Sequence, residues 1–202
     1  MKPGLASKVS VLTGAVMLLG SSPAASSAPS VISISSSGRI GSLQLDKSTR
    51  KSVVATTGRP AAVRTSRFAG SRVSYVALGY DCHDVEGRRT LGLTLRGPYC
   101  TTVFLINRRT GKLTDFFSGS QRYRGPGGIR VGTPSAVAER ALHQRLRRAC
   151  GENLGLASRA AQLTIEFAGG RERSDRSIVG AHLQDFALTS RRHDVGLYPY
   201  LC

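Results

Sequence analysis

The sequence predicts an α+β protein of two similar modules, each a short helix followed by an antiparallel β-meander, stapled by disulfides. Three observations lead to this prediction. An amphipathic helical stripe follows Thr133-Pro134, alternating apolar residues follow that stripe, and a shorter version of the same order occurs earlier in the chain. The period of about 85 residues suits a duplicated small domain rather than a solenoid repeat. We therefore expect a first module at 40–122 and a second at 123–202.

In the first module, Leu43 and Leu45 lead into a short helix that contains Val53 and Val54. Asp46 or Ser48 can cap its start, and Gly58 followed by Pro60 can end it. Taken alone, residues 52–57 are β-branched enough to be a strand, and the capping signals favour the helix. The strands expected after this helix are 73–80, the alternating Leu91, Leu93 and Leu95, and a hairpin of 101–106 and 112–118 around a turn at 107–111.

The second module repeats this order, with Ile129 and Val131 as its apolar lead-in. Thr133 suits the N-cap and Pro134 the first helical position. The predicted helix has about 16 residues. Its apolar stripe consists of Ala138, Leu142, Leu146 and Ala149, with Val137 and Ala141 beside it, and Arg145, Arg147 and Arg148 close its C-terminal end. The strands expected next contain Leu163, Ile165 and Phe167, then a charged tip at 169–176 and a return at 177–186.

The N-terminus has the pattern of a secretory signal peptide, predicted at 1–27. Lys2 and Lys8 precede the uncharged apolar run Val9–Gly20, and small residues follow. A helix that spans a membrane needs about 20 apolar residues. No stretch after the signal peptide is apolar over that length, so we expect no membrane span after signal removal. The expected location is secreted or extracellular, including association with the cell wall.

The cut is expected after Ala24 or Ser27, because Pro29 impedes cleavage after Ala28. The mature chain then begins between Ala25 and Ser30. Residues 28–39 are rich in Ser, and we expect them to form a flexible N-terminus.

Four cysteines in an exported chain predict two disulfides. Three pairings are open, and we favour Cys82–Cys100 and Cys150–Cys202 because each bond then stays within one half of the protein. The shorter loop contributes about 3 kcal/mol and the longer about 4 kcal/mol to stability. A metal site is not expected, since there is no CxxC or HxxxH and the histidines are dispersed (His83, His143, His182 and His193). No cofactor is expected.

The chain carries 29 basic and 12 acidic residues, a formal net charge of +17. This excess attracts polyanions such as cell-wall polymers, nucleic acid or an acidic partner. However, 24 of the basic residues are Arg and they are scattered, which indicates the codon usage of a GC-rich genome. We therefore expect an extracellular protein or an anionic cell-envelope polymer as partner, and find no specific nucleic-acid motif.

The stretch Tyr123–Thr133, the helix with Val and the hairpins with a Cys carry a resemblance. Their order resembles the small secreted modules of the SmpA/OmlA type and, in tandem, the β-lactamase-inhibitory-protein family. The stretch itself is similar to a junction of uncharacterised actinobacterial exported proteins. The inhibitor family carries one disulfide in each of two modules and inserts side chains of a concave sheet and a hairpin loop into a partner enzyme. The resemblance implies binding and transfers no individual residue.

Catalytic patterns are weak. There is no GxSxG sequence, and all four cysteines are expected to be oxidised, so no catalytic residue is assigned. Asp81, Asp84 and Glu86 surround Cys82 and His83, as in a weak Ca²⁺ loop or an acid/base pair, but a solvated loop fits better. The glycine-rich 125–132 is expected to be a flexible link rather than a phosphate loop. The tail 191–202 is expected to pack beside Cys202 rather than form an exposed recognition segment.

The resulting hypothesis is a secreted, non-catalytic binding protein for a protein or cell-envelope partner. Two alternatives stay open: a small extracytoplasmic hydrolase with an unrecognised site, and a basic structural protein of the cell wall. A hydrolase needs a concave pocket with convergent polar groups, whereas a binding module needs a broad sheet face with exposed aromatic and Arg side chains.

Overall fold

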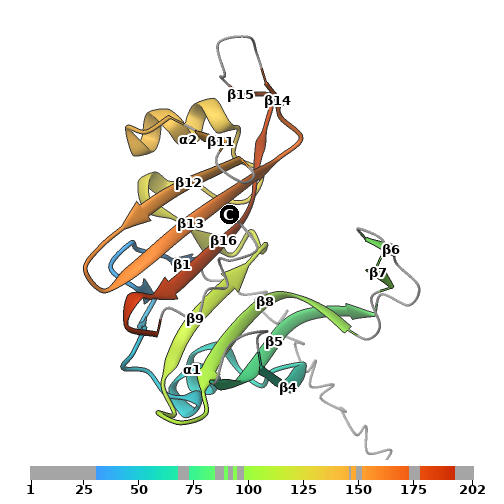
Figure 1. Cartoon of the computed structure of the whole chain (residues 1–202), viewed down its shortest axis with the longest axis vertical. Coiled ribbons are helices and arrows are strands. Elements are labelled where there is room, and N and C mark those ends of the chain that lie inside the picture. Colours follow the sequence, from blue (N-terminus) through green and yellow to red (C-terminus); the bar gives the residue numbers. More distant parts are fainter. Residues whose placement is uncertain are drawn as a thin grey trace, which may run out of the picture.

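A computed structural model describes residues 31–67, 73–84, 89–90, 93–94, 98–145, 147–148, 152–172 and 178–193. These residues form a strand-dominated α+β fold, in which two short α-helices accompany one eight-stranded sheet (Figure 1). The strand order is β11-β12-β13-β16-β9-β8-β5-β4, and every neighbouring pair is antiparallel. The predicted α+β class is confirmed, and the strands of both halves belong to one sheet.

Each half of the chain supplies four consecutive strands of this sheet. The first half gives β4 (Ala62–Arg67), β5 (Ser74–Asp84), β8 (Pro98–Asn107) and β9 (Leu113–Ser118), and the second gives β11 (Arg147–Arg148), β12 (Glu152–Ala157), β13 (Ala161–Ala168) and β16 (His182–Ser190). The two sets meet where β9 pairs with β16 at the centre of the sheet.

The remaining elements are short. They are β1 (Ile32–Ser33), β2 (Arg39–Ile40), β3 (Leu43–Gln44), α1 (Arg50–Thr57), β6 (Arg89–Thr90), β7 (Leu93–Thr94), β10 (Tyr123–Arg124), η1 (Pro126–Gly128), α2 (Ser135–Leu142), β14 (Arg171–Glu172), β15 (Ile178–Val179) and η2 (Arg191–His193). The pairs β6–β7 and β14–β15 project from the sheet (Figure 1).

The first predicted helix exists as α1, but its cap differs from both candidates. Thr49 is the N-cap, its hydroxyl accepts from the Ser52 backbone N–H, and the Ser52 hydroxyl accepts from the Thr49 N–H. This reciprocal capping satisfies donors that the first turn leaves open. Ser48 instead accepts from the Gln44 N–H. Gly58 ends the helix at a positive φ of 87°, as expected.

The second helix is half as long as predicted, since α2 spans 8 residues. His143 adopts φ 51° and closes the helix with hydrogen bonds from its own N–H to Arg140 and from the Gln144 N–H to Glu139. This is a Schellman-type end with histidine where glycine is usual. Pro134 rather than Thr133 is the N-cap, and no side chain caps it. Arg147 and Arg148 lie in β11, not in the helix.

Val137, predicted to lie beside the apolar stripe of the helix, is 42% exposed. Ala138 is fully buried, and Ala141 and Leu142 are half-buried. The predicted stripe is therefore confirmed at Ala138, and Val137 does not belong to the buried face of the helix.

One hydrophobic core lies on one face of the sheet, called here the first face. Phe104, Phe116 and Tyr123 form a stack across it, with ring centroids 5.0 and 4.9 Å apart. The core also takes in Val53 of α1, Ala138 of α2 and the apolar residues of both halves of the sheet, among them Leu78, Leu163, Ile165, Phe167, Phe186 and Leu188. The predicted alternation of Leu163, Ile165 and Phe167 is confirmed.

Residues 31–39, predicted to be flexible, pack into the fold. Ile32 pairs in parallel with Tyr123, and Ile34 is 3% exposed. The glycine-rich link is likewise packed, because Ile129 is buried and a Cβ at Gly125 would lie 2.7 Å from the Phe186 ring. Both segments are rich in serine or glycine, a composition that predicted flexibility. They are ordered because the apolar residues between those serines and glycines pack into the fold.

Candidate functional site

The opposite face of the sheet, called the second face, carries two adjoining regions. Opposed strand residues share a face, so the register assigns Gly79, Val103 and Phe117 to it, followed by Ala187 and Thr164 across β16 and β13. Over β4, β5, β8 and β9 this face is hollowed, and over β9, β16 and β13 it is polar.

The hollow, called the groove, has a volume of about 290 Å³. Small residues on β4 and β5 make its floor: Ala62 lies opposite Gly79, and Ala77 lies two positions before Gly79 on β5. Its lining consists of Ala62, Arg64, Ala77, Gly79, Tyr99, Cys100, Val103 and Phe117. Tyr99 is 47% exposed and Arg64 is also exposed, so an apolar wall is flanked by a phenol and a guanidinium.

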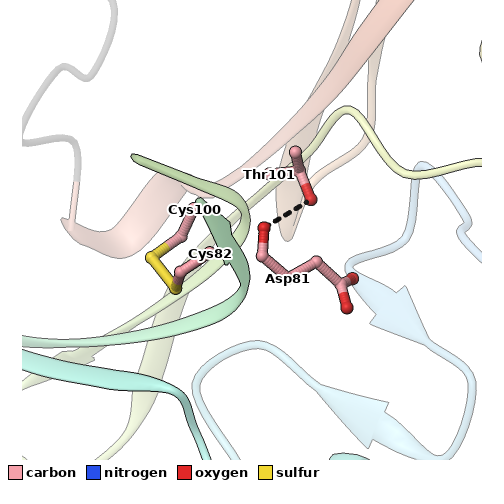
Figure 2. Close-up of a disulfide and its surroundings, with 4 residues drawn as sticks. All are labelled: Asp81, Cys82, Cys100 and Thr101. Atoms are coloured by element: carbon pink, nitrogen blue, oxygen red, sulfur yellow. Dashed lines mark hydrogen bonds between the residues drawn. A yellow bond between two sulfur atoms is a disulfide. The ribbon is translucent and has the colours of Figure 1, made fainter. Parts of the chain in front are cut away.

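The Cys82–Cys100 disulfide joins β5 to β8 at one end of the groove, as predicted, with Cα atoms 3.8 Å apart (Figure 2). Its sulfur atoms lie over Gly79, where a Cβ would overlap the Sγ of Cys100. Beside it, Asp81 has a φ of 51°, and its carbonyl accepts a hydrogen bond of 3.3 Å from the Thr101 hydroxyl (Figure 2). Left-handed Asp81 interrupts the alternation along β5 and turns the disulfide toward the groove.

The polar region, called the strip, consists of Asp115, Thr164, Glu166, Asp185 and Thr189. Glu166 lies opposite Asp185, and Thr189 lies opposite Asp115. All except the half-buried Glu166 are 3–4% exposed, which is rare for acidic residues.

Burial raises the pKa of both carboxyl groups of the facing pair. The pKa of Asp185 rises to about 8, first through burial and then through the neighbouring charge of Glu166 and a hydrogen bond with it. Burial also raises the pKa of Glu166, while the hydrogen bond from Asp185 opposes that rise. The pair therefore holds a proton near neutral pH, because two carboxyl groups on directly opposed strand residues do not both ionise readily.

Several other residues singled out in the sequence are exposed or lie outside the described residues. Cys150, Cys202, Glu86 and the signal peptide 1–27 lie outside them. Asp81 and His83 are exposed. Within the described part of the chain, no three His, Cys, Asp or Glu residues converge as metal ligands would, and no helix there has the length and apolarity needed to cross a bilayer.

Sequence reasoning missed Arg64, Tyr99, Glu166 and Asp185. Glu166 stands between the core residues Ile165 and Phe167 in an alternating strand. Alternation assigns it to the other face of the strand, where a polar residue attracts no attention because such a face usually meets solvent.

No protein-family model matches the chain, and no curated protein matches it. Among solved structures, the fold is similar to the uncharacterized protein yfeY from Escherichia coli, with a TM-score of 0.46 and 13% sequence identity. The match covers 78% of this chain and 99% of that one.

Proposed function

We propose that this chain is a secreted, non-catalytic binding protein that uses the groove of its second face to hold a protein partner. The observation that carries the proposal is the exposure of Tyr99 and Arg64 at the rim of an apolar hollow. Tyr and Arg dominate the centres of protein interfaces. Their arrangement suits a partner's apolar side chain that lies next to a carboxylate.

Export is supported by the signal-like N-terminus and by the disulfide between β5 and β8. Disulfides persist in oxidising compartments and are rare in the cytosol. The scattered positive charge would favour retention near an anionic envelope.

We also propose that the two halves arose by duplication, in line with the resemblance to tandem inhibitor-like modules. In each half a helix precedes four consecutive strands of the sheet. The N-cap of each helix bridges to the start of the fourth strand: Thr49 to Lys112, and Pro134 to His182. Main-chain hydrogen bonds repeat as well, because Leu113 bonds to Asp46 and Ser48 while Leu183 bonds to Gly132 and Thr133.

A hydrolase is the second candidate, favoured by the facing carboxyls of Glu166 and Asp185. A proton held near neutral pH suits general acid catalysis. The lining of the groove, however, is largely apolar and includes neither carboxyl.

The test is capture from the culture medium and envelope extract of the source organism by the immobilised mature protein. Wild type is compared with the groove variant Arg64→Glu/Tyr99→Ala and with Val137→Ala, which alters an apolar residue of similar exposure on α2. We expect a partner that wild type and Val137→Ala retain and that the groove variant loses. Equal retention by all three would contradict the groove as the binding site.

Salt separates this proposal from the alternative of a wall protein held by charge. Bound molecules that all three proteins release between low and physiological salt would be held by electrostatic attraction between exposed charges, which salt screens beyond about 8 Å at 0.15 M. A hydrolytic activity abolished by Asp185→Asn, with capture unchanged, would favour the second candidate.

A further inference from the structure

We propose that the outer edge of β4 is a docking site for an extended acidic segment of the protein partner, which adds to the sheet as a further strand. The inference rests on the proposed function, because it takes the groove as the place that a side chain of this segment enters. It adds the way in which the partner binds, through its backbone as well as through its side chains.

β4 is a terminal strand of the sheet (Figure 1). Among the described residues it pairs only with β5, in continuous register from Ala62 to Arg67. About half of the backbone N–H and C=O groups of such a strand point away from its neighbour, where another chain can pair with them. The middle of this edge is open to solvent, because Val63, Arg64 and Thr65 are all exposed, Val63 by 48%.

The two ends of the sheet differ in the length of their edges. As described, the edge strand β11 comprises only Arg147 and Arg148, whereas β4 has 6 residues. Proteins usually protect an open edge with a short strand, proline, lysine or a β-bulge. β4 contains no proline or lysine, and its pairing with β5 has no bulge. It therefore offers about 20 Å of edge to a partner strand.

The two faces of β4 specify the side chains of the added strand, because directly opposed residues of paired strands lie on the same face. On the second face, Ala62 and Arg64 line the groove. A large apolar residue opposite the small Ala62 would lean over the groove, and an acidic residue opposite Arg64 would pair with its guanidinium. On the first face, Val63 and Thr65 suit β-branched neighbours. The expected segment has an apolar and an acidic residue two positions apart, with β-branched residues between and beside them.

Charge favours an acidic partner over a second copy of this chain. Arg64 is exposed at the middle of β4, and Arg59 is exposed just before the strand. Two copies paired through β4 would bring their Arg64 side chains together, and each chain carries a formal net charge of +17. Like charges on paired strands destabilise the pairing, and net charges of one sign repel. The same charges attract an acidic segment.

A synthetic peptide tests the backbone contacts. Thr-Leu-Val-Glu-Val-Leu-Thr has the expected pattern in both directions, so it fits a parallel or an antiparallel strand. Fluorescence anisotropy gives its affinity for the mature protein and that of two N-methylated forms, one methylated on the Leu and Glu amides and the other on the Val amides. Successive amides of a strand point to opposite edges, so only one set can meet β4. One methylated form should lose at least about tenfold in affinity, and the other should bind like the unmodified peptide.

The same peptide tests the charge. Replacing its Glu by Lys should weaken binding to the wild-type protein about fivefold, and Arg64→Glu should reverse the preference. Equal effects of the two methylation patterns, or no binding of the unmodified peptide up to about 1 mM, would overturn strand addition. Capture of a partner that still depends on Arg64 and Tyr99 would then leave the groove as the binding site, so the two proposals can fail separately.

Hydrogen exchange, followed by NMR, locates the peptide on the protein. At a peptide concentration of about ten times the dissociation constant, the outward amides of β4 should exchange about tenfold more slowly, at every second residue of the strand. The amides of the exposed Lys51 and Val137, on the two helices, are the controls and should keep their rates. Unchanged exchange along β4, or slowing equal to that of the controls, would overturn the proposed docking edge.

Discussion

Gly79 shows how one residue makes room for the disulfide. Its missing side chain leaves the space above β5 that the Cys82 and Cys100 sulfur atoms occupy. Gly79→Ala should therefore lower the free energy of unfolding by roughly 1–3 kcal/mol, the usual cost of overpacking. Urea denaturation of the oxidised protein measures this.

Gly119→Ala is the matched control, because its Cβ would meet only ordinary contacts at 3.5 Å and beyond. It should be neutral or slightly stabilising. Similar losses for both variants would show that the disulfide does not restrict position 79.

Asp185 makes stability depend on pH. Its folded pKa, about 8, lies above the usual value, so the folded state keeps a proton that the unfolded chain releases. Its contribution to stability is complete below about pH 4 and is lost as the pH rises to about 8, by at most ~1.4 kcal/mol per pH unit. Glu166 lies opposite Asp185, and burial raises its pKa as well, so it also shapes the curve.

Asp185→Asn should flatten this decline, since the amide cannot ionise, and exposed Asp81→Asn should leave it in place. Free energies of unfolding between pH 4 and pH 8.5 decide the matter. A wild-type curve that rises across this range, with Asp185→Asn parallel to it, would contradict the protonated pair.

At the residue scale, the Cys82–Cys100 bond was predicted because it stays within one half of the protein, and the structure contains it. It did not indicate Glu166 or Asp185 as unusual. Alternation separates two faces of a strand, but it does not say whether the second face meets water or another segment.

The helices show what capping signals predict. In α1 a threonine and a serine three residues apart close the first turn, and this pattern stands in the sequence beside the predicted caps. Thr49→Ala should cost about 1 kcal/mol, within a usual range of about 0.5–2. Lys51→Ala, at an exposed position of the same helix, is the control, and a cost equal to that of Thr49→Ala would argue against the cap.

The length of α2 was not predictable from periodicity, because apolar residues continue at helical spacing through Leu146 and Ala149. The helix ends at a left-handed His143, a conformation that the sequence marks far less clearly than a glycine would. The hairpin around 107–111 was predictable, since the Asn107 side chain accepts from the Arg109 and Thr110 N–H groups and Gly111 has a positive φ.

At the scale of the whole molecule, the two halves share one sheet and one core. The pairing of β9 with β16 joins residues about 70 positions apart, and no local pattern specifies such a contact. The sequence therefore predicted both helices and several strands of each half, but it did not predict β4, β11, β12 or the continuity between the halves.

This continuity predicts one cooperative unfolding transition. Phe116→Ala in the first half and Leu163→Ala in the second remove fully buried side chains and should each cost roughly 2–5 kcal/mol. Each should shift the whole calorimetric transition, because both residues stabilise the same core. Two resolved transitions, each sensitive to one variant, would show that the halves unfold separately.

The central claim is that the groove binds a partner, and the affinity of the captured partner tests it most directly. Titration calorimetry would give its dissociation constant for wild type, Tyr99→Ala and Val137→Ala. An aromatic at the centre of an interface contributes about 2 kcal/mol or more, so Tyr99→Ala should weaken binding by roughly thirtyfold while Val137→Ala stays near wild type. Equal dissociation constants for wild type and Tyr99→Ala would contradict the account.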